Sequence, residues 1–331
     1  MDIGVSLGSA QALGLTDKRV DIPATAAHLM VGEGCRFACA FCAQGRDSKS
    51  RRHFLSRISW PPFPMDEVAR RLAAAHESGA VRRGCIQVVY GGDYVRQMER
   101  FFYLLHRTGR EVPMAVNAVV RSPADADRIF ALGADRLGLA LDAASPEVFA
   151  RCKRQSPAEW VSRIELLRDL AAIYPGRITT HLIAGMGETE RDLAEVVQIM
   201  ADVGVAVGLF AFTPVRGTPM EAHRAPPVSA YRRVQLAAYL ITRGIGRVED
   251  FAFDSADRMA AIPAQMLGPE VVGEGIPFRT SGCEGCNRPY YNERPGQTPY
   301  NYARPLQEGE VRAALEATGL FPGGMMMEAS S

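Results

Sequence analysis

The sequence lacks long apolar runs and lacks an excess of charge of either sign. No apolar stretch reaches the roughly 18 residues that a membrane span needs. The first ten residues have neither the basic nor the apolar region of a secretion signal. We therefore expect a cytoplasmic protein without a membrane partner. The formal net charge of the 331 residues is +1, so nucleic acid, which attracts strongly basic chains, is not an expected partner.

Cysteine is scarce, and its number is odd. An odd count in a cytoplasmic chain argues against a disulfide framework and indicates metal ligands or reactive thiols. Three cysteines fall within eight positions, two within four, and two stand alone. The seven are Cys35, Cys39, Cys42, Cys85, Cys152, Cys283 and Cys286.

Strand and helix patterns alternate through the middle of the chain. The strands are predicted at 26–32, 85–90, 114–120, 136–142, 178–184 and 205–213, and the helices at 66–78, 123–132, 157–173, 190–203 and 230–243. About six β-α units of this kind predict an α/β fold with a parallel sheet, open or rolled into a barrel. In such barrels the chemistry lies at the carboxyl ends of the strands.

The composition divides the chain into three parts. Residues 1–24 are an expected N-terminal extension, residues 25–249 hold the β-α units, and residues 250–331 form a separate C-terminal element rich in Gly, Pro, Asn, Arg and Tyr that contains the last two cysteines. The final residues, with Met325, Met326 and Met327, are predicted to be a mobile tail.

Cys35, Cys39 and Cys42 follow the first predicted strand with Cys-x3-Cys-x2-Cys spacing. Three thiolates in one loop suit a four-iron cluster with one iron left open, and an open metal position is typical of a catalytic site. The alternatives are a zinc loop or three buried thiols. Structural zinc closes with a fourth ligand at short spacing, and the loop contains none.

Several motifs at strand ends, together with these cysteines, resemble the radical S-adenosylmethionine (SAM) superfamily. Alone, each short motif is weak, but their order along the chain supports the resemblance. It implies a partial (β/α)6 barrel, a 4Fe-4S cluster and SAM, whose reductive cleavage yields a radical that removes hydrogen from an unactivated carbon. Residues expected at SAM are Phe41, Gly91, Gly92, Asp93, Asp142, Ile183, Gly185, Glu188 and Pro214. Asp93 stands where the family has Glu, and His181 replaces a usual Gly.

Cys283 and Cys286 form a Cys-x2-Cys pair in a Gly- and Pro-rich loop, which is typical of a metal site. A second iron–sulfur cluster, a zinc knuckle and a redox pair all remain open. Two further ligands are needed, and Cys152, Cys85 and Ser281 are the candidates. Cys152 follows the fourth strand near the active face, whereas Cys85 begins the second strand and is expected toward the opposite end of the barrel.

The whole chain is most similar to the two-protein lipoyl synthases. The matching stretches are residues 27–30, 41–44, 55–61, 280–283 and 287–290. The resemblance implies insertion of one sulfur into an octanoyl or mercapto-octanoyl chain on a lipoyl-carrier domain, with a second 4Fe-4S cluster as sulfur donor. It also implies a companion lipoyl synthase protein and a ferredoxin-like or flavodoxin-like electron donor. It names no catalytic side chain.

Other functions remain as alternatives. Biotin synthase is the main rival, although the predicted strands 114–120 and 178–184 carry none of the inner cysteines expected of it. A radical SAM enzyme on another free small molecule and a non-catalytic metal scaffold are further alternatives, and the near-neutral charge argues against an RNA-modifying enzyme. The basic segment 46–57 is either a solvated loop or a docking rim for an acidic carrier domain.

Overall fold

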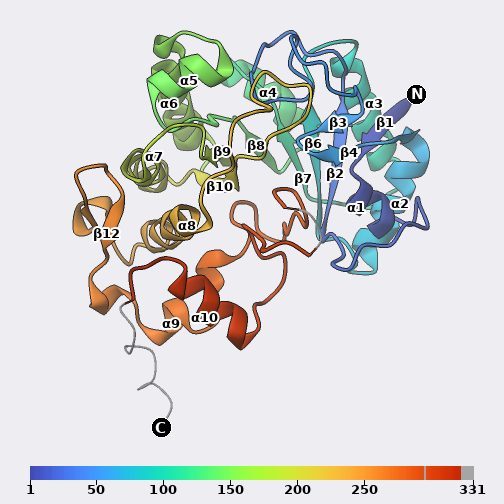
Figure 1. The fold of residues 1–331 in the computed structure, drawn as a ribbon. Helices are drawn as coiled ribbons and strands as arrows, with labels where there is room; N and C mark the ends of the chain where they lie inside the picture. Colours follow the sequence, from blue (N-terminus) through green and yellow to red (C-terminus); the bar gives the residue numbers. More distant parts are fainter. Residues whose placement is uncertain (294–295, 322–331) are drawn as a thin grey trace.

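Six parallel strands form the centre of the computed structural model, which describes residues 1–293 and 296–321. They lie side by side in chain order, and Figure 1 shows them at the middle of the molecule. The six are β2 (Ala26–Val31), β6 (Arg83–Val88), β7 (Met114–Asn117), β8 (Arg136–Gly138), β9 (Ile178–Ala184) and β10 (Ala206–Ala211). This is the α/β arrangement with a partial parallel barrel that the sequence predicted.

Two short antiparallel strands extend the sheet beyond β2. They are β1 (Asp2–Val5) and β5 (Pro62–Pro64), and β1 pairs with both β2 and β5. Part of the predicted N-terminal extension therefore belongs to the central sheet. Neither strand has an alternating pattern long enough to be recognised in the sequence.

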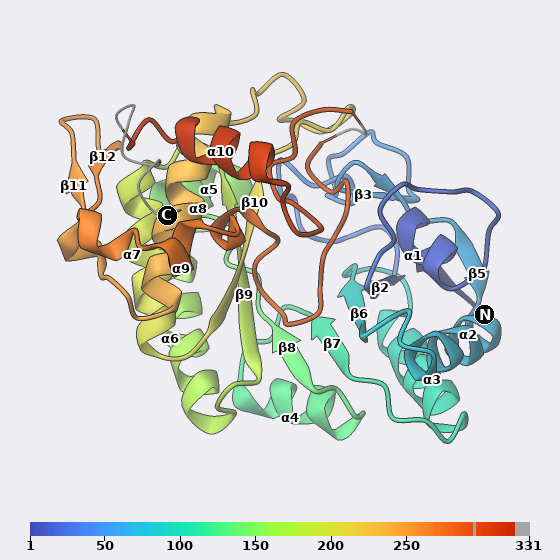
Figure 2. The same ribbon diagram turned by 90° about the horizontal axis from the view of Figure 1, so that it is seen from below.

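Seven helices follow the strands and lie on the outside of the sheet (Figures 1 and 2). They are α2 (Met65–Glu77), α3 (Tyr94–His106), α4 (Pro123–Ala131), α5 (Pro146–Lys153), α6 (Pro157–Ile173), α7 (Glu190–Asp202) and α8 (Val228–Thr242). The predicted bounds of α6 and β9 agree with the structure, and the other predicted elements end within a few residues of theirs. The sequence analysis missed α3 and α5.

The remaining elements are short. They are α1 (Leu7–Ala12), β3 (Phe54–Leu55), β4 (Ile58–Ser59), η1 (Val248–Asp250), β11 (Ala252–Phe253), β12 (Met259–Ala261), η2 (Ala264–Met266), α9 (Pro269–Val272), η3 (Ile276–Phe278) and α10 (Glu308–Glu316). Among the described residues, no helix combines the length and the apolar character that a membrane span requires. The predicted mobile tail lies outside the described residues.

The gap between β10 and β2 is bridged by residues 279–293 and 296–302, which together we call the closing segment (Figure 2). On the β10 side, Ser281 Oγ accepts a hydrogen bond from the Leu209 amide. On the β2 side, the Asn287 side chain accepts one from the Thr25 amide. Gly282 has a φ of +105°, and a Cβ there would lie 3.2 Å from the Gly208 Cα. A side chain at position 282 would therefore crowd the backbone of β10.

Candidate active site

A cavity of about 210 Å³ lies inside the barrel, between the sheet and the closing segment. One part of its wall is apolar and includes Phe41, Trp60 and Phe212. The other part is polar and carries three thiols, two imidazoles and two guanidinium groups. These polar residues are His28, Arg83, Cys85, His181, Cys283, Cys286 and Arg288. The cavity therefore joins an apolar surface to a group of thiols.

The loop after β2 brings Cys35, Cys39 and Cys42 together. Burial raises the pKa of Cys42 to about 12, and the two other thiols add to this because like charges nearby disfavour ionisation. The pKa of Cys39 is raised in the same way, mainly by burial. A bound metal centre stabilises neighbouring thiolates, because its positive charge offsets the repulsion between their negative charges. The donor set fits a three-thiolate cluster at this loop.

Gly91 supports this loop from the neighbouring strand end. The Glu33 amide donates to the Gly91 carbonyl at 3.2 Å. A Cβ at Gly91 would lie 2.0 Å from the Gly34 carbonyl oxygen, so only glycine fits. Gly92 follows with a φ of +59°, and the Asp93 side chain is exposed and forms a long ion pair with Arg96. The glycines thus bring the turn after β6 against the cysteine loop.

Asp142 follows β8 and lines the cavity in a left-handed backbone conformation, with a φ of +67°. Its Oδ2 atom lies 2.5 Å from Lys153 Nζ, and both side chains are buried. Lys153 also donates to the Ala140 carbonyl. The lysine thus fixes the orientation of the carboxylate that was expected to meet the SAM ribose.

The remaining residues expected at SAM have different environments. Ile183 and Phe41 line the cavity. The Glu188 carboxylate accepts hydrogen bonds from the Gly185 and Met186 amides and so closes the turn after β9. Burial raises the pKa of Glu188. Pro214 is exposed and does not line the cavity, although its neighbours Thr213 and Val215 do.

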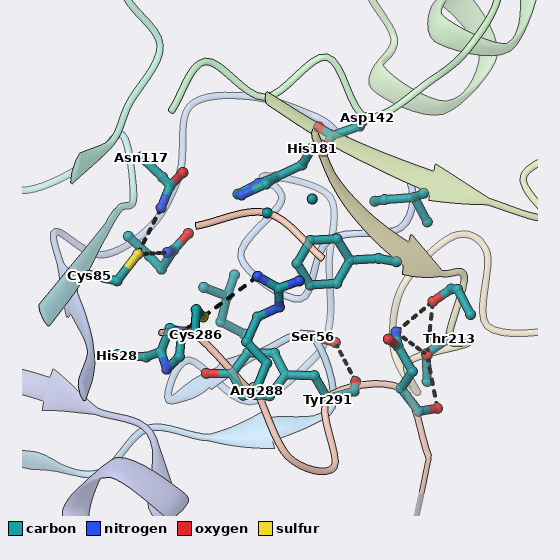
Figure 3. A pocket seen from close by; sticks show the side chains of 18 of the residues that line it. His28, Ser56, Cys85, Asn117, Asp142, His181, Thr213, Cys286, Arg288 and Tyr291 are labelled. Atoms are coloured by element: carbon teal, nitrogen blue, oxygen red, sulfur yellow. Dashed lines mark hydrogen bonds between the residues drawn. The ribbon is translucent and has the colours of Figure 1, made fainter. Parts of the chain in front are cut away.

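The structure brings Cys85 to Cys283 and Cys286 in the polar part of the cavity. Burial raises the pKa of Cys85, and the two C-terminal thiols raise it further. Burial likewise raises the pKa of Cys283. Figure 3 shows Cys85 and Cys286 beside His28 and Arg288. The structure begins β6 at Arg83 and not at Cys85, so Cys85 lies within the strand and lines the cavity.

Cys152 and Ser281 do not join these thiols. Cys152 is fully buried among Phe149, Met186 and Phe212, outside the cavity wall. Its carbonyl accepts a hydrogen bond from the Ala40 amide, so this residue supports the first cysteine loop from behind. The structure thus places Cys85, and not Cys152, in the cavity with the C-terminal pair. Ser281 is held by β10 through its hydroxyl, as described above.

Both imidazoles in the cavity are held neutral by burial. The pKa of His28 is lowered to about 3, and Arg288 contributes to this after desolvation. The pKa of His181 is lowered to about 4 for the same main reason. His28 Nδ1 is buried and has no hydrogen-bond partner among the described residues. Neutral imidazoles leave the guanidinium groups of Arg83 and Arg288 as the positive charges of this part of the cavity.

The polar residues that surround the second group of thiols were not predicted from the sequence. Gln87 and Asn117 both donate to Cys85. A signal for them was present, because Cys85 and Gln87 are two apart in a strand and therefore share a face. His28 pairs in register with Cys85, and Gln87 with Asn117. Polar side chains at alternate positions of a buried parallel strand indicate a lined cavity rather than a core.

Within the described part of the chain, no group of three or more His, Cys, Asp or Glu side chains is already spaced to bind a single metal ion. That result concerns one ion. Ligands of a single tetrahedral zinc lie about 2.3 Å from the metal and close to one another. A four-iron cluster takes one thiolate per iron, so its cysteines stand further apart.

A model of the radical SAM superfamily matches residues 29–200, about half of the chain. The chain is 27% identical over 212 residues to a biotin synthase of Acidithiobacillus ferrooxidans, covering 62% of each protein. It is 29% identical over 222 residues to the ribosomal protein uS12 methylthiotransferase RimO of Anaeromyxobacter sp., covering 60% of this chain and 43% of the relative. The chain thus spans less than two thirds of the length of these curated relatives.

Among solved structures, the chain resembles the FeFe-hydrogenase maturase HydG of Carboxydothermus hydrogenoformans. The TM-score is 0.52 at 16% identity, over 66% of this chain and 51% of that one. At this identity the likeness concerns the fold alone. It agrees with the partial parallel barrel described above.

Proposed function

Because the chain belongs to the radical SAM superfamily, we propose that it is a sulfur-inserting enzyme, one component of a two-protein lipoyl synthase. Its substrate is an octanoyl or mercapto-octanoyl chain carried by a protein domain. The relatives named biotin synthase and methylthiotransferase support sulfur transfer as the reaction class. The lipoyl substrate rests on the sequence resemblance and on the cavity.

The observation that carries the proposal is the second group of thiols within the cavity. Cys85, Cys283 and Cys286 share one cavity with Cys42 of the first loop. A sulfur source must lie within reach of the carbon from which hydrogen has been removed. We therefore assign these three thiols to a second 4Fe-4S cluster, which would serve as sulfur donor, and leave Cys152 and Ser281 out of its ligand set.

The first group of thiols would hold the cluster that binds SAM. A reduced cluster with SAM supplies a radical that removes hydrogen from a carbon no side-chain base could deprotonate at neutral pH. The chain's own residues orient and shield that chemistry. Asp142, fixed by Lys153, would receive the ribose, and the turn at Gly91 would receive the methionine part of SAM. Phe41 and Trp60 would exclude water beside the alkyl chain.

The basic segment 46–57 supplies a candidate docking rim. Its residues Leu55 and Ser56 line the cavity, so the segment is in part next to it. Arg51 and Arg52 are exposed, and neither forms a salt bridge among the described residues. An acidic carrier domain would be attracted here and would deliver its acyl chain into the cavity.

Charge reversal tests this docking. Arg51→Glu/Arg52→Glu should weaken binding of the octanoylated carrier domain by roughly tenfold at low ionic strength, and the difference should shrink as salt rises. Calorimetry or surface binding at several salt concentrations measures it. Equal affinity of variant and wild type at every concentration would refute the rim. In that case the segment is a solvated loop.

Iron and sulfide content after anaerobic reconstitution tests the second cluster. The wild type should contain about eight irons per chain, and Cys283→Ala/Cys286→Ala about four. Mass spectrometry of an octanoylated carrier peptide should then reveal added sulfur with the wild type alone. About four irons in both proteins would refute the second cluster and the lipoyl assignment with it. The Cys pair would then be tested with zinc.

A second candidate function is sulfur insertion into a free small molecule, as in biotin synthase. The match to biotin synthase over 62% of both chains favours it. Competition distinguishes the two candidates. Dethiobiotin, the biotin precursor, should neither stimulate SAM cleavage nor gain sulfur if the carrier-bound chain is the substrate.

A further inference from the structure

Two amide side chains point at the sulfur of Cys85. Asn117 Nδ2 lies 3.0 Å and Gln87 Nε2 lies 3.2 Å from Cys85 Sγ (Figure 3). The three residues come from the paired strands β6 and β7 and face the cavity. A neutral thiol is a weak acceptor. Two amide donors on one partly buried sulfur therefore suit a thiolate, which accepts such bonds well.

The sulfur of Cys286 has the same kind of surroundings. Arg288 Nη1 lies 3.6 Å and His28 Nε2 lies 3.5 Å from Cys286 Sγ. The guanidinium is held in place, because its other nitrogen donates to the Ser281 carbonyl at 2.7 Å and its centre lies 4.4 Å from the Phe210 ring. In the tautomer that carries its proton on Nε2, the imidazole of His28 also donates to the sulfur.

Cys283 differs from its two partners. Among the residues that the structure describes, no side-chain N–H is hydrogen-bonded to Cys283 Sγ. The four donors are therefore directed at two particular sulfurs of the three. They come from three strands and from the closing segment, so their convergence is a property of the tertiary structure.

We propose that these four side chains are positioning residues, whose N–H groups stabilise negative charge on the sulfurs of the second cluster and raise its reduction potential. This inference rests on the proposed second cluster. Reduction adds one negative charge to a cluster, and donors to its thiolates stabilise the reduced form more than the oxidised form. The same bonds orient the thiolates, as outer contacts do at other metal sites.

The test uses the reconstituted holoprotein. Gln87→Met/Asn117→Leu removes both donors of Cys85 while keeping similar side-chain volumes. Thr179→Val is the matched control, because Thr179 lines the same cavity but has no hydrogen bond to a sulfur in the described structure. The potentials of both clusters are measured by redox titration followed by electron paramagnetic resonance. The release of iron to a chelator is measured in parallel. Cys283→Ala/Cys286→Ala provides the signal of the first cluster alone.

The double variant should have a second cluster with a more negative potential and faster iron release, whereas its first cluster and the Thr179→Val control should match the wild type. Selective loss of the second cluster in the double variant would also support the inference, since its thiolates would then depend on the donors. An intact second cluster with wild-type potential and iron release would overturn it. About eight irons in Cys283→Ala/Cys286→Ala would instead overturn the assigned ligand set of the proposed function.

Discussion

The buried ion pair of Asp142 and Lys153 leads to a prediction about stability. The two side chains are 12% and 7% exposed, and Lys153 Nζ lies 2.5 Å from Asp142 Oδ2. At an effective dielectric constant of about 20, the gross attraction of such a pair is about 7 kcal/mol. Desolvation of both charges offsets most of it. Removing one partner leaves the other charge buried and uncompensated, so the cost of a single substitution exceeds the net value of the pair.

We therefore expect Lys153→Met to lower the free energy of unfolding by about 3–5 kcal/mol. Asp142→Asn should also destabilise the protein, because it leaves the lysine unpaired. Asp142→Asn/Lys153→Met should cost less than the sum of the two single substitutions, with a coupling energy of about 1–3 kcal/mol. The reason is that the double variant contains no buried unpaired charge.

Urea unfolding of the cofactor-free protein, followed by circular dichroism, measures these differences under one condition. Arg70→Met is the matched control, since its ion pair with Asp66 is exposed and should contribute only about 0–1 kcal/mol. Additive single effects, or a loss of less than about 1 kcal/mol in Lys153→Met, would refute the reasoning. Either result would mean that water or a side-chain rearrangement compensates the buried carboxylate.

Three further predictions concern iron content, measured after reconstitution. Cys85→Ala should lose the second cluster, as Cys283→Ala/Cys286→Ala does, whereas Cys152→Ala should keep about eight irons per chain. Equal iron content in Cys85→Ala and Cys152→Ala would contradict the proposed ligand set. Gly91→Ala should lose iron from the first loop, because its Cβ meets a carbonyl oxygen at 2.0 Å, whereas Gly309→Ala, with open space around it, should not. Ser281→Ala should keep both clusters. Its free energy of unfolding in urea should fall by about 1 kcal/mol, because the Ser281 hydroxyl accepts a hydrogen bond from the Leu209 amide of β10. Loss of the second cluster's iron in this variant would instead make Ser281 a ligand.

Local patterns were enough to predict most of the barrel. The helix at 157–173 begins at a Ser-Pro pair that caps it, and β9 is a continuous run of strand-forming residues, so both were predicted with their observed bounds. The helix α3 was missed because it starts after two glycines without a side-chain cap. The strand β1 was missed because four residues carry too little pattern.

The second group of thiols could be predicted only in part. The Cys-x2-Cys spacing indicates a metal site at Cys283 and Cys286 by itself. The third thiol in the same part of the cavity, Cys85, lies about 200 residues away on β6, and no local pattern distinguishes it from Cys152. Cys85 was expected toward the far end of the barrel from its position along the strand, and that position does not predict how deep the cavity is.

The sequence by itself determined the first cysteine loop and the parallel α/β order, since both depend on spacing along the chain. Only the tertiary structure decided which distant groups meet. The closing segment bridges β10 and β2, and it carries Cys286 to His28 and Arg288 to the face of Phe210. Such contacts follow from the packing of whole elements, whose relative placement depends on many weak interactions rather than on any local residue pattern.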